Sequence, residues 1–323
     1  MDLYYNGVVI TSPPPITICV VIPAYKVKVH INKVVGSIGP EVQKIIVVDD
    51  ACPEQSGSLV QENTKDPRVE VIFHSRNMGV GGAVKTGYQR AIDLNSQIIV
   101  KMDGDGQMDS ARIQNLSDPI LSGIADYTKG NRFFNVEAVR KMPKIRIIGN
   151  LGLSFLTKLS SGYWKIFDPS NGFTAISKNK LLSLPLEKID NRYFFESDML
   201  FRLNLANSRV LDVSIPAIYE TEKSNLKISR VLFEFPIKHT RNLIKRVLYT
   251  YYVRDFSPGS IELPIGIILS FFGIFLGVQS WFNSFESQVP TQIGTLFLIS
   301  TTCLAGLQFL LAFLTNDMNR EVK

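Results

Sequence analysis

The sequence predicts an α/β protein with a mostly parallel sheet and helices on both faces, followed by amphipathic surface helices and two transmembrane helices. Four short apolar runs alternate with helical stretches, which is typical of a doubly wound parallel sheet. The runs are 16–22, 44–48, 69–73 and 97–102, with helices expected near 28–38, 55–64 and 80–94. Nearer the carboxyl end, the segments 263–285 and 287–316 carry no charge. Each meets the length of about 20 residues that crosses a bilayer as a helix.

These patterns divide the 323 residues into consecutive parts. We expect an amino-terminal tail, an α/β domain, amphipathic juxtamembrane helices, a two-helix transmembrane hairpin and a short cytoplasmic tail. Their predicted bounds are 1–15, 16–225, 226–260, 261–316 and 317–323. The juxtamembrane part mixes apolar residues with Lys and Arg, a composition that favours helices lying on a membrane surface, with Pro236 marking a bend or a start.

The charge distribution indicates the class of ligand, and the cysteine content indicates the redox compartment. The net charge is +6, and basic residues gather near 132–146 and 230–248, close to the expected membrane segments. This placement favours lipid headgroups or anionic lipid substrates over nucleic acid. Three widely spaced cysteines (Cys19, Cys52 and Cys303) give no metal-ligand pattern and favour free thiols in a reducing compartment.

The orientation in the membrane also follows from the flanking residues. The first ten residues lack the basic region of a signal peptide, so we expect the α/β domain to stay in the cytoplasm. The two apolar segments are flanked by Arg246, Arg254, Arg320 and Lys323, whereas the turn between them has no Lys or Arg. By the positive-inside rule both ends lie in the cytoplasm, which predicts a multi-pass protein of the inner (cytoplasmic) membrane.

The motif Asp103-Gly104-Asp105-Gly106-Gln107 directly follows the fourth apolar run. The chain can bend at its two glycines, so both carboxylates can turn toward one ligand. Hard oxygen ligands suit Mg²⁺ or Mn²⁺, which commonly bridge protein carboxylates to a substrate's phosphates. An EF-hand is excluded, because Met108 stands where Gly is needed and Gln114 where an acid is needed. An ordinary polar turn remains the alternative.

Other polar motifs also follow apolar runs, where ligands bind in such sheets. They are Pro23-Ala24-Tyr25, Asp49-Asp50 and the stretch 74–77. A glycine cluster, 79–82, precedes the helix that contains Lys85, and Val84 rules out both a Walker loop and a dinucleotide fingerprint. The cluster either offers backbone N–H groups to a phosphate or permits tight helix packing.

Together these motifs resemble the family-2 glycosyltransferases of the GT-A fold over roughly residues 16–220. The motifs that carry the resemblance are 21–25, 47–50, 77–79 and 103–107. With the two apolar segments, the chain looks most like the polyprenol-phosphate glycosyltransferases. The motifs 130–132 and 168–173 match that group less tightly. Two departures are Ala51-Cys52-Pro53 after the acidic pair and Gly104 in place of Ala.

The resemblance implies roles for individual residues. The nucleotide-sugar would be held by Pro23, Ala24, Tyr25, Asp49, Asp50 and Asp103, with Gly82 and Lys85 as further candidates. Asp105 and Gln107 would hold the Mg²⁺ or Mn²⁺ and, through it, the diphosphate. The acceptor phosphate would meet Arg132, Lys144 and Arg146. The catalytic candidates are Asp103, Asp105, Arg132 and Asp198.

Three functions remain open. The first is inverting transfer of one sugar, UDP-linked by resemblance, to a polyprenyl phosphate on the cytoplasmic face; an ionised phosphate needs no general base. The second is transfer to a sugar hydroxyl of a glycolipid or polysaccharide, with Asp198 as the base, although this acid equally suits a helix start. The third is a non-catalytic scaffold, against which the intact acidic motif argues. Small residues (Gly266, Gly273 and Gly277) also favour homo-oligomers through the transmembrane helices.

Overall fold

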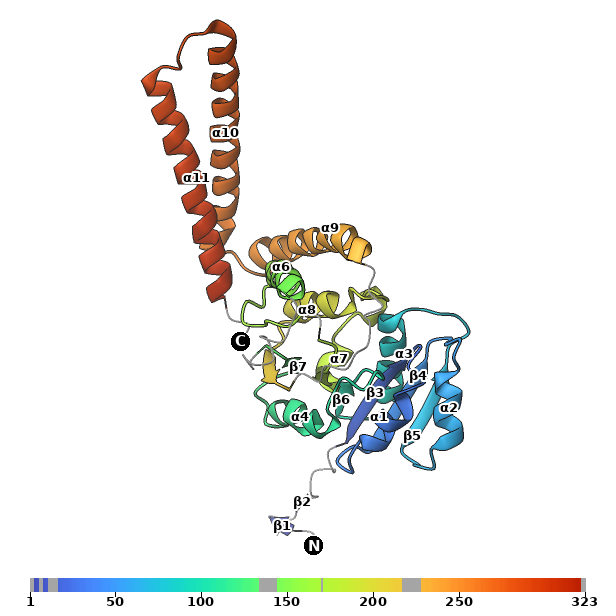
Figure 1. Cartoon of the computed structure of the whole chain (residues 1–323). Helices are drawn as coiled ribbons and strands as arrows, with labels where there is room; N and C mark the ends of the chain where they lie inside the picture. Colours follow the sequence, from blue (N-terminus) through green and yellow to red (C-terminus); the bar gives the residue numbers. More distant parts are fainter. Residues whose placement is uncertain are drawn as a thin grey trace.

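The computed structural model describes residues 3–5, 8–10, 17–133, 144–169, 171–216 and 228–320 (Figure 1). For 3–5, 8–10, 144–148 and 228–233 only the course of the backbone is described. A short antiparallel pair, β1 (Leu3–Tyr5) and β2 (Val8–Ile10), lies within the stretch predicted as a tail.

Within the described ranges, the main sheet has seven strands in the order β5-β4-β3-β6-β8-β7-β9. Their bounds are β3 (Ile18–Ala24), β4 (Lys44–Asp49), β5 (Val69–Phe73), β6 (Ile98–Lys101), β7 (Tyr127–Asn131), β8 (Thr174–Ser177) and β9 (Val210–Ser214). The first four are parallel and match the four predicted apolar runs. β8 runs antiparallel to both its neighbours, and β7 is parallel to β9. The predicted mostly parallel sheet is confirmed.

Helices cover both faces of this sheet, because successive side chains of each strand point to opposite faces. Along β3, Ile18, Val20 and Ile22 pack with α1, α2 and α4, whereas Cys19 and Val21 pack with α3, α7 and α8. The helices are α1 (Ile31–Ser37), α2 (Ser56–Asn63), α3 (Val80–Asp93), α4 (Ile113–Leu121) after the 3₁₀ turn η1 (Ser110–Arg112), α6 (Lys144–Ser161), α7 (Lys178–Leu182), the 3₁₀ turn η2 (Leu186–Lys188) and α8 (Phe195–Leu205).

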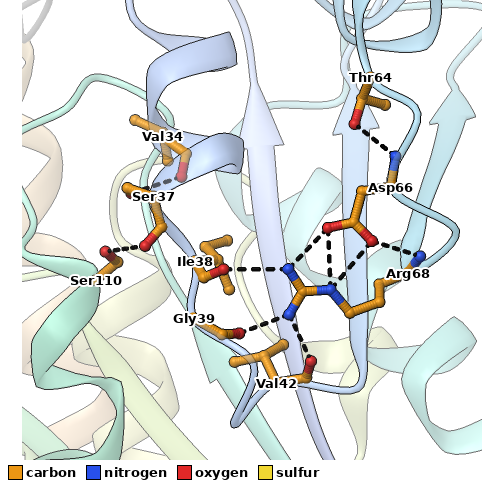
Figure 2. A network of polar contacts seen from close by, with 9 residues as sticks. All are labelled: Val34, Ser37, Ile38, Gly39, Val42, Thr64, Asp66, Arg68 and Ser110. Carbon is orange, nitrogen blue, oxygen red and sulfur yellow. Dashed lines mark hydrogen bonds and ion pairs between the residues drawn. The ribbon is translucent and has the colours of Figure 1, made fainter.

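A guanidinium clamp closes the edge of the sheet where β4 and β5 begin (Figure 2). Arg68 forms a bidentate pair with Asp66, in which Nε donates to Oδ1 at 3.1 Å and Nη2 donates to Oδ2 at 2.7 Å. The same side chain donates to the carbonyl oxygens of Ile38, Gly39 and Val42 in the loop after α1. These bonds satisfy carbonyls just after α1, so Arg68 stabilises the fold at the end of the strands opposite to the acidic motif.

Beyond the sheet, α9 (Ile228–Leu248) continues into a π-helical stretch, η3 (Tyr249–Arg254). One helix runs through Pro236, so this residue does not mark a helix start, and the bend stays a prediction. Then α10 (Pro258–Ser287) and α11 (Ile293–Asn319) form a long antiparallel pair that projects from the α/β body, and α9 extends to one side of its base (Figure 1). Both are long and apolar enough to cross a membrane, and only 11% and 6% of their most apolar windows are buried. They are therefore not core helices of the α/β domain.

The glycines of this hairpin serve contacts within the chain. A Cβ at Gly266 would lie 2.9 Å from Leu310, one at Gly273 would lie 2.6 Å from Cys303, and one at Gly306 would lie 2.5 Å from Ser270. Close backbone approach between α10 and α11 thus uses the small residues on which homo-oligomer formation was predicted. Because these glycines are occupied by contacts within the chain, they no longer support homo-oligomer formation, which stays a prediction. The three cysteines are free, as expected.

Candidate active site

The predicted polar motifs meet at the carboxyl ends of the parallel strands. Ala24, the last residue of β3, pairs in register with Asp49, the last residue of β4. Val21 of β3 pairs with Lys101 of β6, so the motif that begins at Asp103 lies beside the end of β3. Pro23 and Ala24 are buried, whereas the side chain of Tyr25 is exposed at this edge. The acidic motif and the nucleoside candidates therefore share one edge of the sheet.

Asp49 is buried and shapes the loop that follows it. Its Oδ1 accepts a hydrogen bond from the backbone N–H of Cys52 at 2.7 Å, and its Oδ2 accepts one from Gly57 at 2.6 Å. Gly57 lies in the first turn of α2, where a carboxylate is favoured by the unpaired N–H groups. The carboxylate of Asp49 thus supports the loop and the start of α2.

Asp50 likewise supports a second loop at the carboxyl ends of the strands, the loop that contains residues 77–79. Its carboxylate accepts from the backbone N–H groups of Met78 and Gly79, both at 2.7 Å, and bonds His74 Nδ1 at 2.8 Å. The motif 77–79 is thereby tied to the end of β4. Both members of the acidic pair hold backbone that would line a nucleoside pocket, and their predicted contact with the nucleoside stays a prediction.

Asp103 is held by a buried lysine. Lys101 Nζ lies 2.8 Å from Asp103 Oδ1 and 3.0 Å from Glu196 Oε1, while the Asp103 side chain keeps 30% of its surface exposed. Burial, the largest effect, lowers the pKa of Lys101, but the combined attraction of Asp103 and Glu196 raises it above the usual lysine value. Lys101 is therefore a fixed cation beneath Asp103.

The loop that contains Asn171 and Gly172 closes over this pair. A Cβ at Gly172 would lie 2.5 Å from Asp103 Oδ2 and closer still to Lys101 Nζ. Only glycine permits this approach, so the loop reaches the acidic motif through its backbone.

Asp105 and Gln107 lie in the turn after Asp103, half-buried. The N–H of Gln107 donates to Asp105 Oδ1 at 3.0 Å, and Gly106 has a φ of +80°, which favours glycine. Within the described ranges no three His, Cys, Asp or Glu side chains group together as a metal site. Carboxylate and amide oxygens nevertheless fit Mg²⁺ or Mn²⁺, which often takes only one or two protein carboxylates and completes its shell with substrate phosphates.

Arg132, just after β7, forms a fork with Asp168. Its Nε lies 2.8 Å from Asp168 Oδ2 and its Nη2 3.0 Å from Oδ1, and Asp168 is fully buried. Lys129 of β7 donates to the carbonyl oxygen of Asn171 in the same loop. Burial lowers the pKa of Lys129 to about 8, although Glu196 and Asp168 oppose this shift. Arg132 and Lys129 thus fix the loop that covers Asp103.

Two acids in the first turn of α8, Glu196 and Asp198, point to different places. Glu196 bonds Lys101 within the site. Asp198 accepts from the backbone N–H of Asp190 at 3.0 Å, from Arg202 Nε at 3.3 Å and from Asn242 Nδ2 of α9 at 3.0 Å. The structure therefore brings Glu196 to the acidic motif and places Asp198 at the contact between α8 and α9.

The glycine cluster before α3 is used for packing. The N–H of Gly82 donates to the carbonyl of Asn191 at 3.0 Å, and a Cβ at Gly81 would overlap the carbonyl of Asp190. Lys85 Nζ donates to the carbonyl of Ile189 at 2.9 Å. Of the two interpretations left open, the contacts of Gly82 and Lys85 favour packing, so phosphate binding by these groups has no structural support.

Two acceptor candidates cannot be placed. Lys144 begins α6 and Arg146 lies in its first turn, but their side chains fall outside the described residues. Their contact with a phosphate stays a prediction.

Lys101 and Glu196 were not among the residues singled out from the sequence. A signal for Lys101 exists: it lies two residues before Asp103 in an apolar run, so strand alternation places both on one face. A lysine inside a buried strand also requires a carboxylate partner. Glu196 is 95 residues away from Lys101 and gives no such local signal.

A mixed sheet of this order, with an acidic motif beyond β6, defines a GT-A-type domain. The chain belongs to glycosyl transferase family 2, whose family model matches residues 19–183. It is 31% identical to a UDP-N-acetylglucosamine–dolichyl-phosphate N-acetylglucosaminyltransferase of Methanococcus voltae, over 71% of this chain and 96% of the relative. It is 28% identical to a polyprenol monophosphomannose synthase of Mycolicibacterium smegmatis, over 61% of this chain and 75% of the relative.

Solved structures agree on the fold. Glucosyl-3-phosphoglycerate synthase of Mycobacterium tuberculosis, crystallised with phosphoglyceric acid, superposes with a TM-score of 0.54 at 19% identity. The match covers 72% of this chain and 80% of that chain. A second crystal structure of that protein, with Mn²⁺, UDP-glucose and phosphoglyceric acid, gives a TM-score of 0.53 at 20% identity, with the same coverage of both chains.

Proposed function

We propose that this protein transfers one sugar from a nucleotide-sugar, UDP-linked, to a polyprenyl phosphate on the cytoplasmic face of the inner membrane. The observation that carries the proposal is that two parts of the chain, the α/β domain and the apolar hairpin, pack against each other through buried contacts. A family-2 domain with an open carboxylate at its acidic motif is joined by buried contacts to a hairpin of membrane-spanning length. One relative is named as a dolichyl-phosphate N-acetylglucosaminyltransferase and another as a polyprenol monophosphomannose synthase, and these names support the same acceptor class.

The donor half of the proposed site lies at the carboxyl edge of the sheet. The nucleoside would rest against the exposed Tyr25 and the backbone held by Asp49 and Asp50. Asp103, Asp105 and Gln107 would hold Mg²⁺ or Mn²⁺, which neutralises charge on the leaving diphosphate when bound. A structural neighbour that contains Mn²⁺ and UDP-glucose supports this choice of metal and nucleotide.

The acceptor half faces the membrane. The outward face of α9 exposes Ile237, Ile244 and Leu248 beside the exposed cations Arg241 and Lys245. Such a face suits a helix at the lipid boundary, with its cations at the headgroups. It would bring a lipid-borne phosphate toward α6, where Lys144 and Arg146 stand at the helix start. Arg132 would influence this phosphate through the loop that it fixes by its fork with Asp168.

The proposed chemistry is a single displacement. An oxygen of the acceptor phosphate attacks the anomeric carbon, a new carbon–oxygen bond forms on the far face, and the bond to the nucleoside diphosphate breaks, so the anomeric configuration inverts. The acceptor's second pKa is about 6, so it is largely ionised at pH 7 and brings no proton to remove. The placement of Asp198 agrees with this scheme, because its carboxylate is engaged by Asp190, Arg202 and Asn242.

The test is a transfer assay with the purified full chain. Radiolabelled UDP-N-acetylglucosamine, UDP-glucose and GDP-mannose are each incubated with undecaprenyl phosphate and Mn²⁺ or Mg²⁺. We expect a lipid-extractable product that releases its sugar in mild acid, as a glycosyl phosphate does, and no product with undecaprenol. Transfer to a glycolipid hydroxyl, with no product on the lipid phosphate, would contradict the proposal and favour the hydroxyl-acceptor alternative.

A further inference from the structure

A buried carboxylate near the end of the apolar hairpin joins the hairpin to the α/β body. Asp317 lies in the last turns of α11, is only 2% exposed, and accepts hydrogen bonds from three other parts of the chain. Arg246 of α9 donates through Nη1 at 2.7 Å and Nη2 at 3.0 Å. Tyr251 of η3 donates at 2.8 Å, and Trp164, just after α6, donates at 2.9 Å. We call these four residues the latch.

Arg246, the arginine of the latch, also contacts the end of α6 and the turn that follows it. Arg246 is also 2% exposed, and its Nη2 donates to the carbonyl of Leu159 near the end of α6 at 2.8 Å. Gly162 has a φ of +77°, and a Cβ there would lie 2.8 Å from Arg246 Nη1. The turn after α6 is therefore built around the guanidinium. Burying an ion pair costs desolvation, and Arg246 Nε is buried without a hydrogen-bond partner, so a pair kept at this place argues for a role in geometry.

A second set of contacts holds the start of α10 to the same point. Ser260 Oγ donates to the carbonyl of Tyr251 at 2.6 Å, and the rings of Tyr251 and Phe313 lie 5.1 Å apart. Both helices of the hairpin are thus fixed to η3. These contacts within the described part of the chain hold the hairpin in a defined direction relative to η3.

From the latch, packed side chains lead to the acidic motif. Ser160 of α6 bonds His239 of α9 at 2.7 Å, and Thr157 of α6 lies 3.4 Å from Ser197 of α8. The neighbour of Ser197 is Glu196, which bonds Lys101 beneath Asp103. The hairpin, α6, α9 and α8 form one continuous support for the site.

We infer that Asp317 is a positioning residue: the latch fixes the height and tilt of the α/β body relative to the membrane hairpin, so that a phosphate on a membrane-embedded acceptor meets the site. The inference rests on the proposed function for its acceptor. It predicts a defect that depends on whether the acceptor is anchored in a bilayer, because a short acceptor that diffuses freely needs no fixed height.

The experiment compares Asp317→Asn with wild-type protein in nanodiscs and in detergent. With undecaprenyl phosphate in nanodiscs we expect kcat/KM to fall about ten-fold or more, since misplacement by about 1 Å is already costly. With farnesyl phosphate in detergent we expect activity within about two-fold of wild type. Asp255→Asn is the matched control, because it breaks the exposed pair with Arg320 near the same end of the hairpin. It should leave both activities unchanged. Equal losses with both acceptors would overturn the inference.

Trp164→Phe provides a second variant that keeps an aromatic ring, although a smaller one, and removes one donor to Asp317. We expect the same selective defect, smaller in size. A distance measurement tests the latch without any acceptor. Spin labels at Leu182→Cys in α7 and Ile267→Cys in α10, in a Cys303→Ala background, should give a narrow distance distribution in the otherwise wild-type chain. Asp317→Asn should broaden it. An unchanged distribution would refute the latch, whereas loss of transfer to every lipid phosphate in wild-type protein would refute only the proposed function.

Discussion

Lys101 Nζ lies between two carboxylates, 2.8 Å from Asp103 Oδ1 and 3.0 Å from Glu196 Oε1, and is buried to 1% exposure. A cation fixed on one oxygen of Asp103 leaves the other to meet a ligand or the loop at Gly172. The arrangement joins the acidic motif after β6 to the first turn of α8. Lys101 and Glu196 thus support Asp103 rigidly from below, and removing either side chain should alter the site in a predictable way.

Lys101→Met should damage both stability and donor use. Removing the cation leaves Asp103 and Glu196 close together without compensation, which typically costs about 3–5 kcal/mol when a buried pair is broken. We expect kcat/KM for the nucleotide-sugar to fall by about 10²-fold through misplacement of Asp103. Denaturation and initial rates of the full chain measure the two effects. Lys44→Met, at the exposed start of β4, is the control and should change neither. A stable variant with normal donor kinetics would show that Lys101 does not orient Asp103.

Glu196→Gln and Asp198→Asn separate the two acids of α8. Asp198 contacts Asn242 and Arg202, so its neutral variant should lose about ten-fold or less and keep the wild-type dependence of kcat on pH from 6 to 9. Glu196→Gln weakens the grip on Lys101 and should raise the donor KM more than Asp198→Asn does. A general base would instead cost about 10²–10⁴-fold on removal. Such a loss for Asp198→Asn, with its pH dependence abolished and a hydroxyl-linked product, would favour the hydroxyl acceptor.

Asp105→Ala should abolish transfer while the protein still folds and inserts. The half-buried carboxylate lies in the turn after β6, where oxygen ligands suit the proposed Mg²⁺ or Mn²⁺. Electron paramagnetic resonance of Mn²⁺ with UDP present should show weaker binding than in wild type. Asp118→Ala, on the exposed face of α4, is the matched control. Full turnover of Asp105→Ala at saturating Mn²⁺ would refute the metal assignment.

Asp66→Asn should lower the free energy of unfolding at pH 7 by about 1 kcal/mol, since Arg68 loses its bidentate partner at a site that is partly exposed. Hydrogen bonds from Arg68 lower the pKa of Asp66 below its usual value. A lowered folded-state pKa stabilises the protein above the unfolded pKa of about 4 and stops doing so as pH falls through the folded value.

The difference between wild type and Asp66→Asn should therefore be full from pH 5.5 to 7 and shrink below about pH 4. Chemical denaturation of the full chain in detergent across this range measures it. Glu62→Gln on the exposed face of α2 should show no such trend. A difference that stayed constant down to acid pH would contradict the role of the charge.

The strands β3, β4 and β6 were predictable because each is a mainly apolar run that is buried on both faces, and β5 is a mainly apolar, half-buried run at the edge of the sheet. β7 escapes such analysis: it is Tyr-Thr-Lys-Gly-Asn, and all five residues are buried. Its polar groups are satisfied by distant partners, as Lys129 is by Asn171 and Asn131 by Asp212. No local pattern encodes those pairings.

The candidate site divides in the same way. Asp103, Asp105 and Gln107 follow a strand directly and could be found from the sequence. The support beneath them could not, because Lys101 meets Glu196 across 95 positions and Arg132 meets Asp168 across 36. Asp198 was a reasonable candidate by spacing alone, but helical rotation turns it toward α9, about 200° around the axis from Glu196.

The glycine contacts of the hairpin bear on how the protein is made. Gly266, Gly273 and Gly306 let α10 and α11 touch along their backbones, and the turn between the helices contains neither Lys nor Arg. In the proposed topology, this turn is translocated across the membrane. A helical pair that interlocks this closely would enter the bilayer as a single unit during synthesis. A bulky residue at Gly273 would therefore first appear as a defect of biogenesis, with poor accumulation of the protein, before any effect on catalysis could be measured.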